Sequence, residues 1–363
     1  MKFPGIIDRY IIRQFFGGFI FALALIISVA ITIDVGEKMR NFVQYHLTPG
    51  QVLREYYLYF IPSMFGLMAQ YFVMITVIYF TSRLANKSEL IAVFNTGMSF
   101  RRFLLPYLFT SSCIAIFMWF GFNYIIPKTD RIRLGFENKY IAYQKISTDA
   151  NIHARINDSI FFYFRIYDNS QKTAYNVNLE EIRGGKLVSK IAAEKAVYDT
   201  LTLTWNFYNY FKRTIDSQIK NETFIKGEKL ATNFLYDPTL NLKRWTHVQE
   251  LNRDELMNTI QMLKQQGTES FKQYEVEYYK RTAKCFGIIL LTIIGVVLSS
   301  KKIRGGLGLH LMFGIALGAI YEVVVKFSDS FAIKADLAPM IAVWIPNFIY
   351  CFIAVILWKK IQE

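Results

Sequence analysis

Cysteine and histidine, which supply most metal and redox sites, are scarce in this chain. Its 363 residues include three cysteines and four histidines. Cys113, Cys285 and Cys351 lie in three different apolar runs, and none belongs to a Cys-x-x-Cys pair. The histidines are scattered and form no His-Glu-x-x-His motif. These absences argue against a disulfide framework, a zinc site and dithiol redox chemistry, so we predict a protein without a metal of its own.

Motifs of catalysis and nucleotide binding are also missing. The chain has no Gly-x-Ser-x-Gly elbow and no Gly-x-x-x-x-Gly-Lys-[Ser/Thr] loop. The Gly-Gly-Lys at 184–186 is followed by Leu187 between two strand-like runs, which does not fit a phosphate-binding loop. Glu180 and Glu181 are adjacent on a predicted strand, where neighbouring side chains face opposite sides. We therefore predict no catalytic residues and no cofactor bound to this chain.

Long apolar runs, by contrast, are abundant. About 18 consecutive apolar residues are enough for a membrane-spanning helix. Four uncharged runs are long enough: Gln14–Ile33, Tyr56–Ser82, Phe103–Pro127 and Leu337–Trp358. Two shorter runs, Cys285–Ser300 and Gly305–Tyr321, have flanking charged residues, and long Lys or Arg stems can reach the membrane interface. The sequence therefore predicts six transmembrane helices.

Positive charge is concentrated between the predicted spans. Lysine and arginine number 42 against 28 acidic residues, which gives a net charge of +14. Basic residues cluster before span 1, between spans 2 and 3, between spans 4 and 5, and after span 6. With six spans these four segments share one side, which the positive-inside rule makes the cytoplasm. This placement explains the charge without a nucleic-acid partner and predicts that both termini are cytoplasmic.

The long segment between spans 3 and 4 then lies outside the cytoplasm. From about Asn151 to Arg244 it is strand-like, because "SIFFYFRIY" and "LTLTWNFYNYF" are rich in aromatic and β-branched residues. We expect an all-β domain of sandwich, jellyroll-like or open-barrel type, followed by a charged helix that stops at Gly267. The predicted organisation is spans 1–3 at 1–127, a β domain at 128–250, a helical connector at 251–276 and spans 4–6 at 277–363.

Two charged residues at the outer end of span 1 are candidates for ligand binding. Lys38 and Arg40 could hold an anionic ligand that enters from the outer leaflet. Alternatively, they solvate the end of the helix or pair with the nearby Asp34 and Glu37.

Span 5 contains the small-residue motif Gly314-x-x-x-Gly318. Small residues four apart allow two helices to approach closely. The motif fits either an interface with a partner subunit or packing within this chain.

The segment "NKSELIAVFNTGMSFRR" between spans 2 and 3 has the pattern of a short amphipathic helix. Asn86 or Ser88 can cap it, Glu89 falls in its first turn, and Gly97 fits the position after its end. Its apolar face consists of Leu90, Val93 and Phe94. Such a short helix is marginal unless it packs on something. It either lies on the membrane interface or docks this face and Glu89 in a groove of a cytoplasmic protein.

Four stretches of the sequence resemble one family. They are "IIDRYIIRQFFGGFIFAL", "SRLANKSELIAVFNTGMSFRRFLLP", "AAEKAVYDTLTLTWNFYN" and "LAPMIAVWIPNFIYCFIAVILWKK". The family is that of the YjgP/YjgQ permeases, the LptF/LptG subunits of the lipopolysaccharide export transporter. The resemblance covers essentially the whole chain, and its most specific parts are S-E-L-x-A-x-x-x-x-G-x-S at 88–99 and W-x-P-N at 344–347. The Asp-Arg-Tyr at 8–10 is more similar to the LptG branch.

The resemblance implies a permease subunit of an ABC transporter that extracts lipopolysaccharide from the inner membrane. The implied partners are a paralogous or identical permease, a cytoplasmic ATPase dimer that binds the ATP, a bitopic periplasmic jellyroll protein and a periplasmic bridge. The β domain here would be a similar periplasmic jellyroll. The implied site residues are Glu89, Leu90, Val93, Phe94 and Gly97 in a coupling helix near 87–97, Lys38 and Arg40 for the substrate, and Gly314 and Gly318 at the gate between subunits. Arg101 and Arg102 either contact the ATPase or anchor span 3 at the lipid headgroups.

Two other functions fit the same architecture. A membrane-anchored scaffold whose β domain binds a periplasmic protein would need no ATPase. An ABC exporter of another lipid or glycolipid would keep the ATPase and change the cargo. Co-purification with an ATPase would favour the transporter over the scaffold. Crosslinking of lipopolysaccharide to positions 38 or 40 would favour lipopolysaccharide over another lipid as the cargo.

Overall fold

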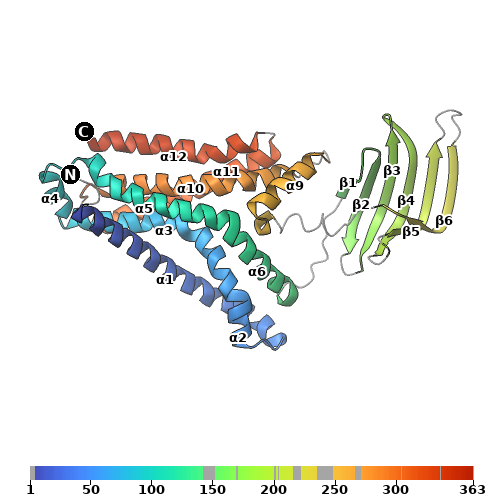
Figure 1. Cartoon of the computed structure of the whole chain (residues 1–363), viewed down its shortest axis with the longest axis horizontal. Coiled ribbons are helices and arrows are strands. Elements are labelled where there is room, and N and C mark those ends of the chain that lie inside the picture. The colour runs from blue at the N-terminus through green and yellow to red at the C-terminus, as the bar shows by residue number, and fades with distance from the viewer. Residues whose placement is uncertain are drawn as a thin grey trace. The chain divides into compact units, whose positions relative to one another are not determined.

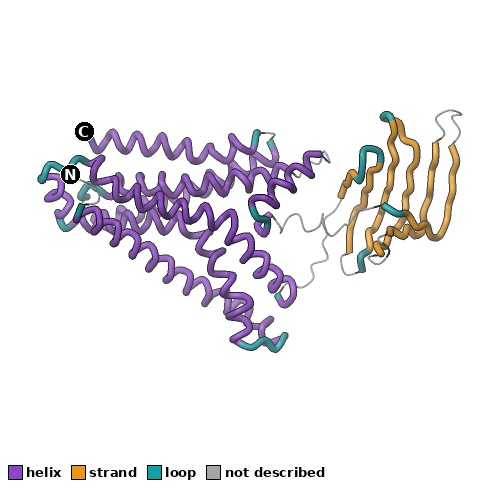
Figure 2. The backbone as a smooth tube through the Cα atoms, in the orientation of Figure 1, coloured by secondary structure: helices purple, strands orange, loops and turns teal. Residues whose placement is uncertain are grey.

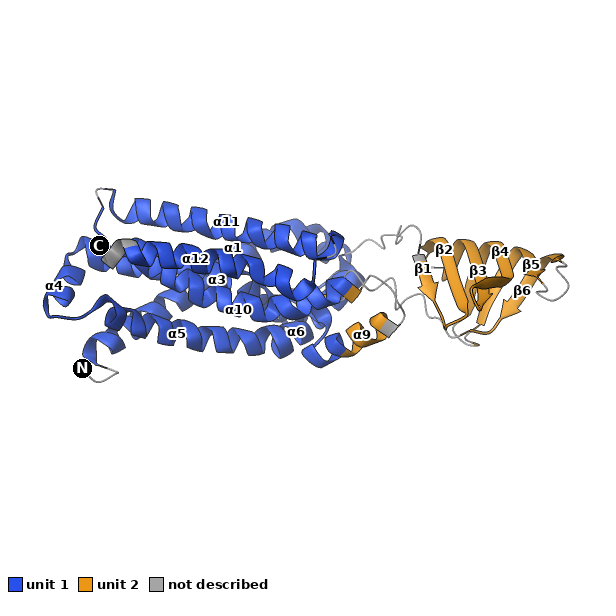
Figure 3. Ribbon diagram, turned by 90° about the horizontal axis from the view of Figure 1, so that it is seen from above, with its two compact units in different colours: residues 1–141, 249–257, 272–363 blue, residues 142–248, 258–271 orange. Residues whose placement is uncertain are grey.

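The computed structural model describes most of the chain in two compact units. The described residues are 5–141, 152–168, 171–199, 202, 204–215, 222–234, 248–265, 271–303, 305–335 and 337–362. The first unit, made of Met1–Ile141, Gln249–Met257 and Lys272–Glu363, is helical. The second unit, made of Ala142–Val248 and Asn258–Phe271, contains the β-sheet (Figure 3).

All six predicted spans form helices in the first unit. The main helices are α1 (Ile6–Gln44), α3 (Leu58–Asn86), α5 (Phe100–Phe120), α10 (Phe271–Ser299), α11 (Gly306–Lys334) and α12 (Pro339–Gln362). Short segments extend two of them: α2 (Pro49–Val52) and the π-helix η1 (Leu53–Tyr57) precede α3, and the π-helix η2 (Gly121–Ile125) joins α5 to α6 (Ile126–Tyr140). Six segments are thus long and apolar enough to cross a membrane, which confirms a multi-span helical architecture.

The helices run beyond the uncharged segments of the sequence. Helix α1 has 39 residues. At about 1.5 Å per residue it is about 58 Å long, nearly twice the roughly 30 Å of hydrocarbon in a bilayer. Its charged ends, with Asp8 at one and Lys38 at the other, therefore have room to lie outside the apolar layer.

Helix α1 packs on the rest of the unit through one narrow stripe. Ile11, Phe15, Phe19 and Leu23 recur every four residues and are buried. Phe15 lies 6.0 Å from the ring of Tyr107 in α5, and Phe19 lies 6.0 Å from the ring of Phe65 in α3. In the apolar window of α1 only 17% of residues are buried, against 61% in α10. Most of the surface of α1 is therefore left for lipid or for another subunit.

The two ends of the helical unit hold different elements. The N-terminus, the C-terminus and the short helix α4 (Glu89–Asn95) lie at one end, which we call the α4 end (Figure 1). Helices α2 and α6 lie at the opposite end, which we call the α6 end. The residues at the α4 end and those at the α6 end are therefore considered as separate candidate sites.

The second unit contains one antiparallel sheet of six strands (Figure 2). The strands are β1 (Ile152–Arg155), β2 (Ile160–Asp168), β3 (Thr173–Arg183), β4 (Lys186–Asp199), β5 (Thr204–Ile215) and β6 (Glu222–Thr232). Each strand pairs with its neighbours in the chain, in the order β1 to β6. This confirms an all-β domain inserted between spans 3 and 4. Within the described residues the strands form a single meander, so the two-sheet order of a jellyroll stays a prediction.

One face of the sheet carries an aromatic core. Its buried aromatic members are Phe162, Phe164, Tyr167, Tyr198, Trp205, Phe207 and Phe234. Trp205 is fully buried between Phe162, with ring centroids 5.0 Å apart, and Tyr198, with centroids 5.2 Å apart. Many of the aromatic residues that distinguish this segment of the sequence therefore fill its core, while others, such as Phe211 and Phe224, are exposed.

The chain returns from the sheet through a short 3-10 helix, η3 (Val248–Glu250), and helix α9 (Arg253–Gln265). The stretch Gln249–Met257 of this return segment belongs to the helical unit, and two arginines of that unit bind it. Arg131 of α6 donates to the carbonyl of Glu250 at 3.2 Å and pairs with Glu255 at 2.7 Å, and Arg281 of α10 donates to the carbonyl of Leu251 at 2.8 Å. The predicted stop at Gly267 lies outside the described residues.

Candidate functional sites

Helix α4 is shorter than the sequence pattern suggests. Helix α3 continues through Asn86, and α4 has seven residues from Glu89 to Asn95. Of the two predicted caps, Asn86 ends α3 and Ser88 stands at the N-cap position of α4, with φ +61° and no side-chain capping bond. At the other end Gly97 adopts φ +84°, and its N–H donates to the carbonyl of Phe94 at 2.9 Å. That left-handed conformation confirms the predicted glycine stop.

The apolar face of α4 points into its own protein. Leu90 is 2% exposed and belongs to the core formed with α1, α3 and α5, and Val93 and Phe94 pack against that core. The ring of Phe94 lies 5.6 Å from that of Phe103 in the first turn of α5, in an edge-to-face arrangement. The rest of the helix surface leaves Glu89, Ile91, Ala92 and Asn95 exposed. In this structure the three apolar residues seat the helix, and the other face is open to a partner.

Glu89 is the charged group on that open face. Its side chain is 47% exposed, and its nearest cation is Lys87 at 3.9 Å. An exposed pair at that distance contributes little. The Glu89 carboxylate is therefore accessible to a cation on another protein.

Lys38, at the α6 end of α1, is enclosed by acceptors. Its ammonium lies 2.6 Å from Asp34 Oδ1 and 3.0 Å from Glu137 Oε1, and it donates to the hydroxyl of Tyr56. An ammonium has three N–H donors, so these contacts use all of them. The Lys38 side chain is only 17% exposed. We call Asp34, Lys38, Tyr56, Tyr57, Arg133 and Glu137 the Lys38 cluster.

The other members of the Lys38 cluster bind its two carboxylates, Asp34 and Glu137. Tyr56 donates to Glu137 Oε1 at 2.8 Å, Tyr57 donates to Asp34 Oδ2 at 3.0 Å, and Arg133 donates to Glu137 Oε1 at 3.0 Å. Arg133 also pairs with the buried Asp130 at 3.1 Å, so three carboxylates of α1 and α6 share two cations, and two tyrosines of η1 donate to two of the carboxylates. The cluster fastens the α6 end of α1 to its neighbours.

Arg40 differs from Lys38 although it is only two residues away. Two residues along a helix correspond to about 200° of rotation, so the two side chains leave opposite sides of α1. Arg40 is exposed and makes no ion pair with any residue that the structure describes. Of the two predicted substrate contacts, Arg40 is the one whose charge is open to an anion here.

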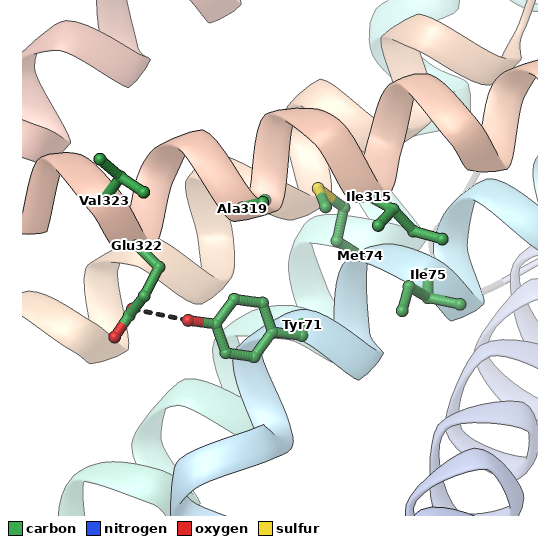
Figure 4. A pocket seen from close by; sticks show the side chains of 8 residues that line it. Tyr71, Met74, Ile75, Ile315, Ala319, Glu322 and Val323 are labelled. Atoms are coloured by element: carbon green, nitrogen blue, oxygen red, sulfur yellow. Dashed lines mark hydrogen bonds between the residues drawn. The ribbon is translucent and has the colours of Figure 1, made fainter.

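A pocket of about 450 Å³ opens between α3 and α11 (Figure 4). Its wall is largely apolar and is formed by Tyr71, Met74, Ile75, Ile315, Gly318, Ala319, Glu322 and Val323. At one end the hydroxyl of Tyr71 donates to Glu322 Oε2 at 2.6 Å. The site could therefore take an apolar chain beside one hydrogen-bonding group.

The glycine pair of span 5 faces α3 within this chain. A Cβ at Gly314 would stand 2.1 Å from Ile78 Cδ1, and one at Gly318 would stand 2.8 Å from Met74 Cε. Both distances are too short for non-bonded carbons. Close packing of α11 on α3 thus explains both glycines, one of the two alternatives that the sequence left open.

An ion pair at the α4 end was missed by sequence reasoning. Asp8 of α1 is 2% exposed and pairs with Arg102 of α5, with Nη1 2.8 Å from Oδ1 and Nη2 2.5 Å from Oδ2. Arg102 was expected to contact an ATPase or lipid headgroups, and here its guanidinium contacts Asp8. The two residues are 94 positions apart, and no local pattern links them.

Among the described residues no group of histidine, cysteine, aspartate or glutamate could hold a metal ion. Membrane-length helices, an inserted β domain and buried ion pairs between helices define a multi-pass membrane protein with a folded domain outside the bilayer. A family model described as "Lipopolysaccharide export system permease LptF/LptG" matches residues 9–360. The chain therefore belongs to the LptF/LptG permease family, whose members are subunits of the ABC transporter that exports lipopolysaccharide from the inner membrane. A comparison with curated proteins gave no match.

Proposed function

We propose that this chain is one of two permease subunits that extract lipopolysaccharide from the inner membrane, powered by a cytoplasmic ATPase dimer, and pass it through the β domain toward a periplasmic bridge. The observation that carries the proposal is the family match over residues 9–360, which includes both helical halves and the inserted domain. The second permease is a paralogous or identical chain, and a bitopic jellyroll protein joins the β domain to the bridge.

The proposed orientation puts the α4 end in the cytoplasm. Basic residues cluster at the start of α1, around α4, between α10 and α11, and at the end of α12. The positive-inside rule favours the cytoplasm for these segments. The β domain, which is inserted between α6 and α10, is then periplasmic.

We propose that α4 is the coupling helix. Leu90, Val93 and Phe94 anchor it to the permease, Gly97 ends it, and Glu89 contacts a cation of the ATPase. This assignment rests on burial, because the apolar face is already occupied and the accessible charge is Glu89. Exposed Ile91 and Ala92 supply apolar contact beside it.

Arg40 is the proposed contact for the anionic part of lipopolysaccharide, and the α3–α11 pocket is the proposed site for part of an acyl chain. Each methylene removed from a bilayer costs roughly 0.8 kcal/mol unless it meets another apolar surface. A pocket of about 450 Å³ with an apolar wall offers such a surface. Lys38 positions the neighbouring Arg40 through its cluster. Gly314 and Gly318 hold α11 close to α3, and so fix which side of α11 is left for the gate and the second subunit.

The proposal is tested by purification in mild detergent followed by reconstitution. We expect an ATPase dimer and a second permease to co-purify in stoichiometric amounts, and the complex to release lipopolysaccharide from vesicles in an ATP-dependent reaction. Purification without an ATPase would favour the membrane-anchored scaffold. Release of a different lipid, with lipopolysaccharide retained, would favour an exporter of another cargo.

The role of Arg40 can be tested by crosslinking from its exposed neighbour. With a photoreactive residue in place of Met39, Arg40→Gln should lower the yield of lipopolysaccharide adduct about 5-fold, because one cation near anionic lipid contributes about 1 kcal/mol. Arg40→Lys is the matched control and should keep most of the adduct, since it keeps the charge. Equal yields from all three proteins would contradict the assignment.

A further inference from the structure

The ion pair between Asp8 and Arg102 joins the first turns of two helices. Asp8 lies in the first turn of α1 and also accepts the N–H of Gly5 at 2.7 Å. Arg102 is the third residue of α5, and its own N–H reaches the Oγ of Ser99, the N-cap of that helix. A guanidinium that binds both oxygens of a carboxylate fixes orientation as well as distance. The starts of α1 and α5 are therefore held in one geometry.

The same turn of α5 carries helix α4. Phe94 of α4 packs on Phe103, the residue after Arg102, and on Phe100, with ring centroids 6.1 Å apart. Phe100 in turn packs on Trp358 of α12 at 5.2 Å. A displacement of α4 would therefore push or pull on Phe100 and Phe103, which flank Arg102 in the first turn of α5.

Helix α1 is the span best suited to move as a rod. Its apolar window is the least buried of the six candidate spans, at 17%. Its ion pairs to other helices lie near its two ends: Asp8 with Arg102 at the α4 end, and Lys38 with Glu137 at the α6 end. Between them it contacts α3 and α5 through one apolar stripe, and among the described residues no hydrogen bond joins this stretch of α1 to either helix.

We propose that the Asp8–Arg102 pair is the link that passes movement of α4 into α1. This inference rests on the proposed coupling role of α4 and deepens it. When the ATPase shifts α4, the first turn of α5 moves with it, and the pair carries the start of α1 along. Asp8 and Arg102 are thus positioning residues that connect ATP hydrolysis to the helix bordering the cargo contact at Arg40.

The experiment compares transport per ATP hydrolysed in the full complex, reconstituted in vesicles that contain lipopolysaccharide. The main variant is Asp8→Asn with Arg102→Gln, which removes both charges and leaves no lone buried ion. The second variant is the exchange Asp8→Arg with Arg102→Asp. The matched control is Lys280→Gln with Asp329→Asn, which removes a comparably buried ion pair between α10 and α11. Thermal unfolding is measured for every variant.

We expect the neutral pair to lower transport per ATP by about 5-fold or more, the low end of typical coupling between sites. The exchange should recover part of that loss, and the control should keep the wild-type ratio even where its melting temperature falls. A wild-type ratio in the neutral variant, an equal loss in the control, or no recovery on exchange would each overturn the link.

Glu89→Lys, measured alongside, separates this inference from the proposed function. If Glu89→Lys uncouples the complex while the neutral pair does not, α4 couples by another route and the link is wrong. If the wild-type complex releases no lipopolysaccharide, the proposed function fails and the link fails with it.

Discussion

A complex that carries Glu89→Lys is expected to lose ATP-driven release of lipopolysaccharide while the permease still folds. Folding should persist because the side chain is 47% exposed and α4 is seated by Leu90 on its other face. Loss of one partner from a desolvated charge pair at an interface costs about 2–5 kcal/mol, and reversal adds repulsion. Transport should therefore fall at least about 30-fold, which a release assay in vesicles measures directly.

The matched control for this prediction is Asn95→Lys. Asn95 is also exposed on α4, but six residues of helix place it on a different side from Glu89, by about 240°. It adds a positive charge to the same helix, so it tests whether position or net charge matters. Normal release in Glu89→Lys, or an equal loss in Asn95→Lys, would show that Glu89 is not the contact.

Lys38→Met is expected to destabilise the permease by about 3 kcal/mol, because it leaves the largely buried Asp34 carboxylate without a counter-ion. Asp34 and Glu137 both lie within 3.0 Å of the lysine ammonium. Arg133 still pairs with Glu137, but no other ion pair to Asp34 is present among the described residues. Thermal unfolding of the purified protein should show the loss as a lower transition temperature and a lower yield of folded material.

Arg40→Met serves as the control for Lys38→Met, because it removes an equivalent charge from an exposed position of the same helix. Its unfolding temperature should match the wild type. Equal unfolding temperatures for Lys38→Met and Arg40→Met would mean that the Lys38 cluster does not fasten α1. The comparison also matters for transport assays, because a transport defect in a Lys38 variant would result from lower stability of the permease and not from lost contact with the cargo.

Much of the fold could be predicted from sequence because its signals are local. Uncharged runs located all six spans, and aromatic and β-branched runs located the sheet. The bounds shifted because helices continue into charged residues: α1 starts at Ile6, well before the run that begins at Gln14. The apolar pattern also identified the buried face of α4, although periodicity does not indicate which protein covers that face.

The polar contacts could not be predicted, since they join residues far apart in the chain. Lys38 meets Glu137 across 99 positions, and Tyr71 meets Glu322 across 251. The sequence placed Lys38 beside Asp34, which is a true neighbour, but nothing local indicated the second carboxylate. Lys38 and Arg40 consequently looked equivalent in sequence, and only the packing of α1 on α6 distinguishes them.

The meander order of the sheet has a consequence for the order of synthesis. Every described ladder joins strands that are adjacent in the chain, so the described strands can pair as soon as β6 has emerged, while the last three spans are still unmade. The first helices lack that independence. Met74 and Ile78 of α3 are buried against Gly318 and Gly314 of α11, which is made later. The paired sheet would therefore precede the complete helical unit, and in the nascent chain α3 would expose to lipid the surface that α11 later covers.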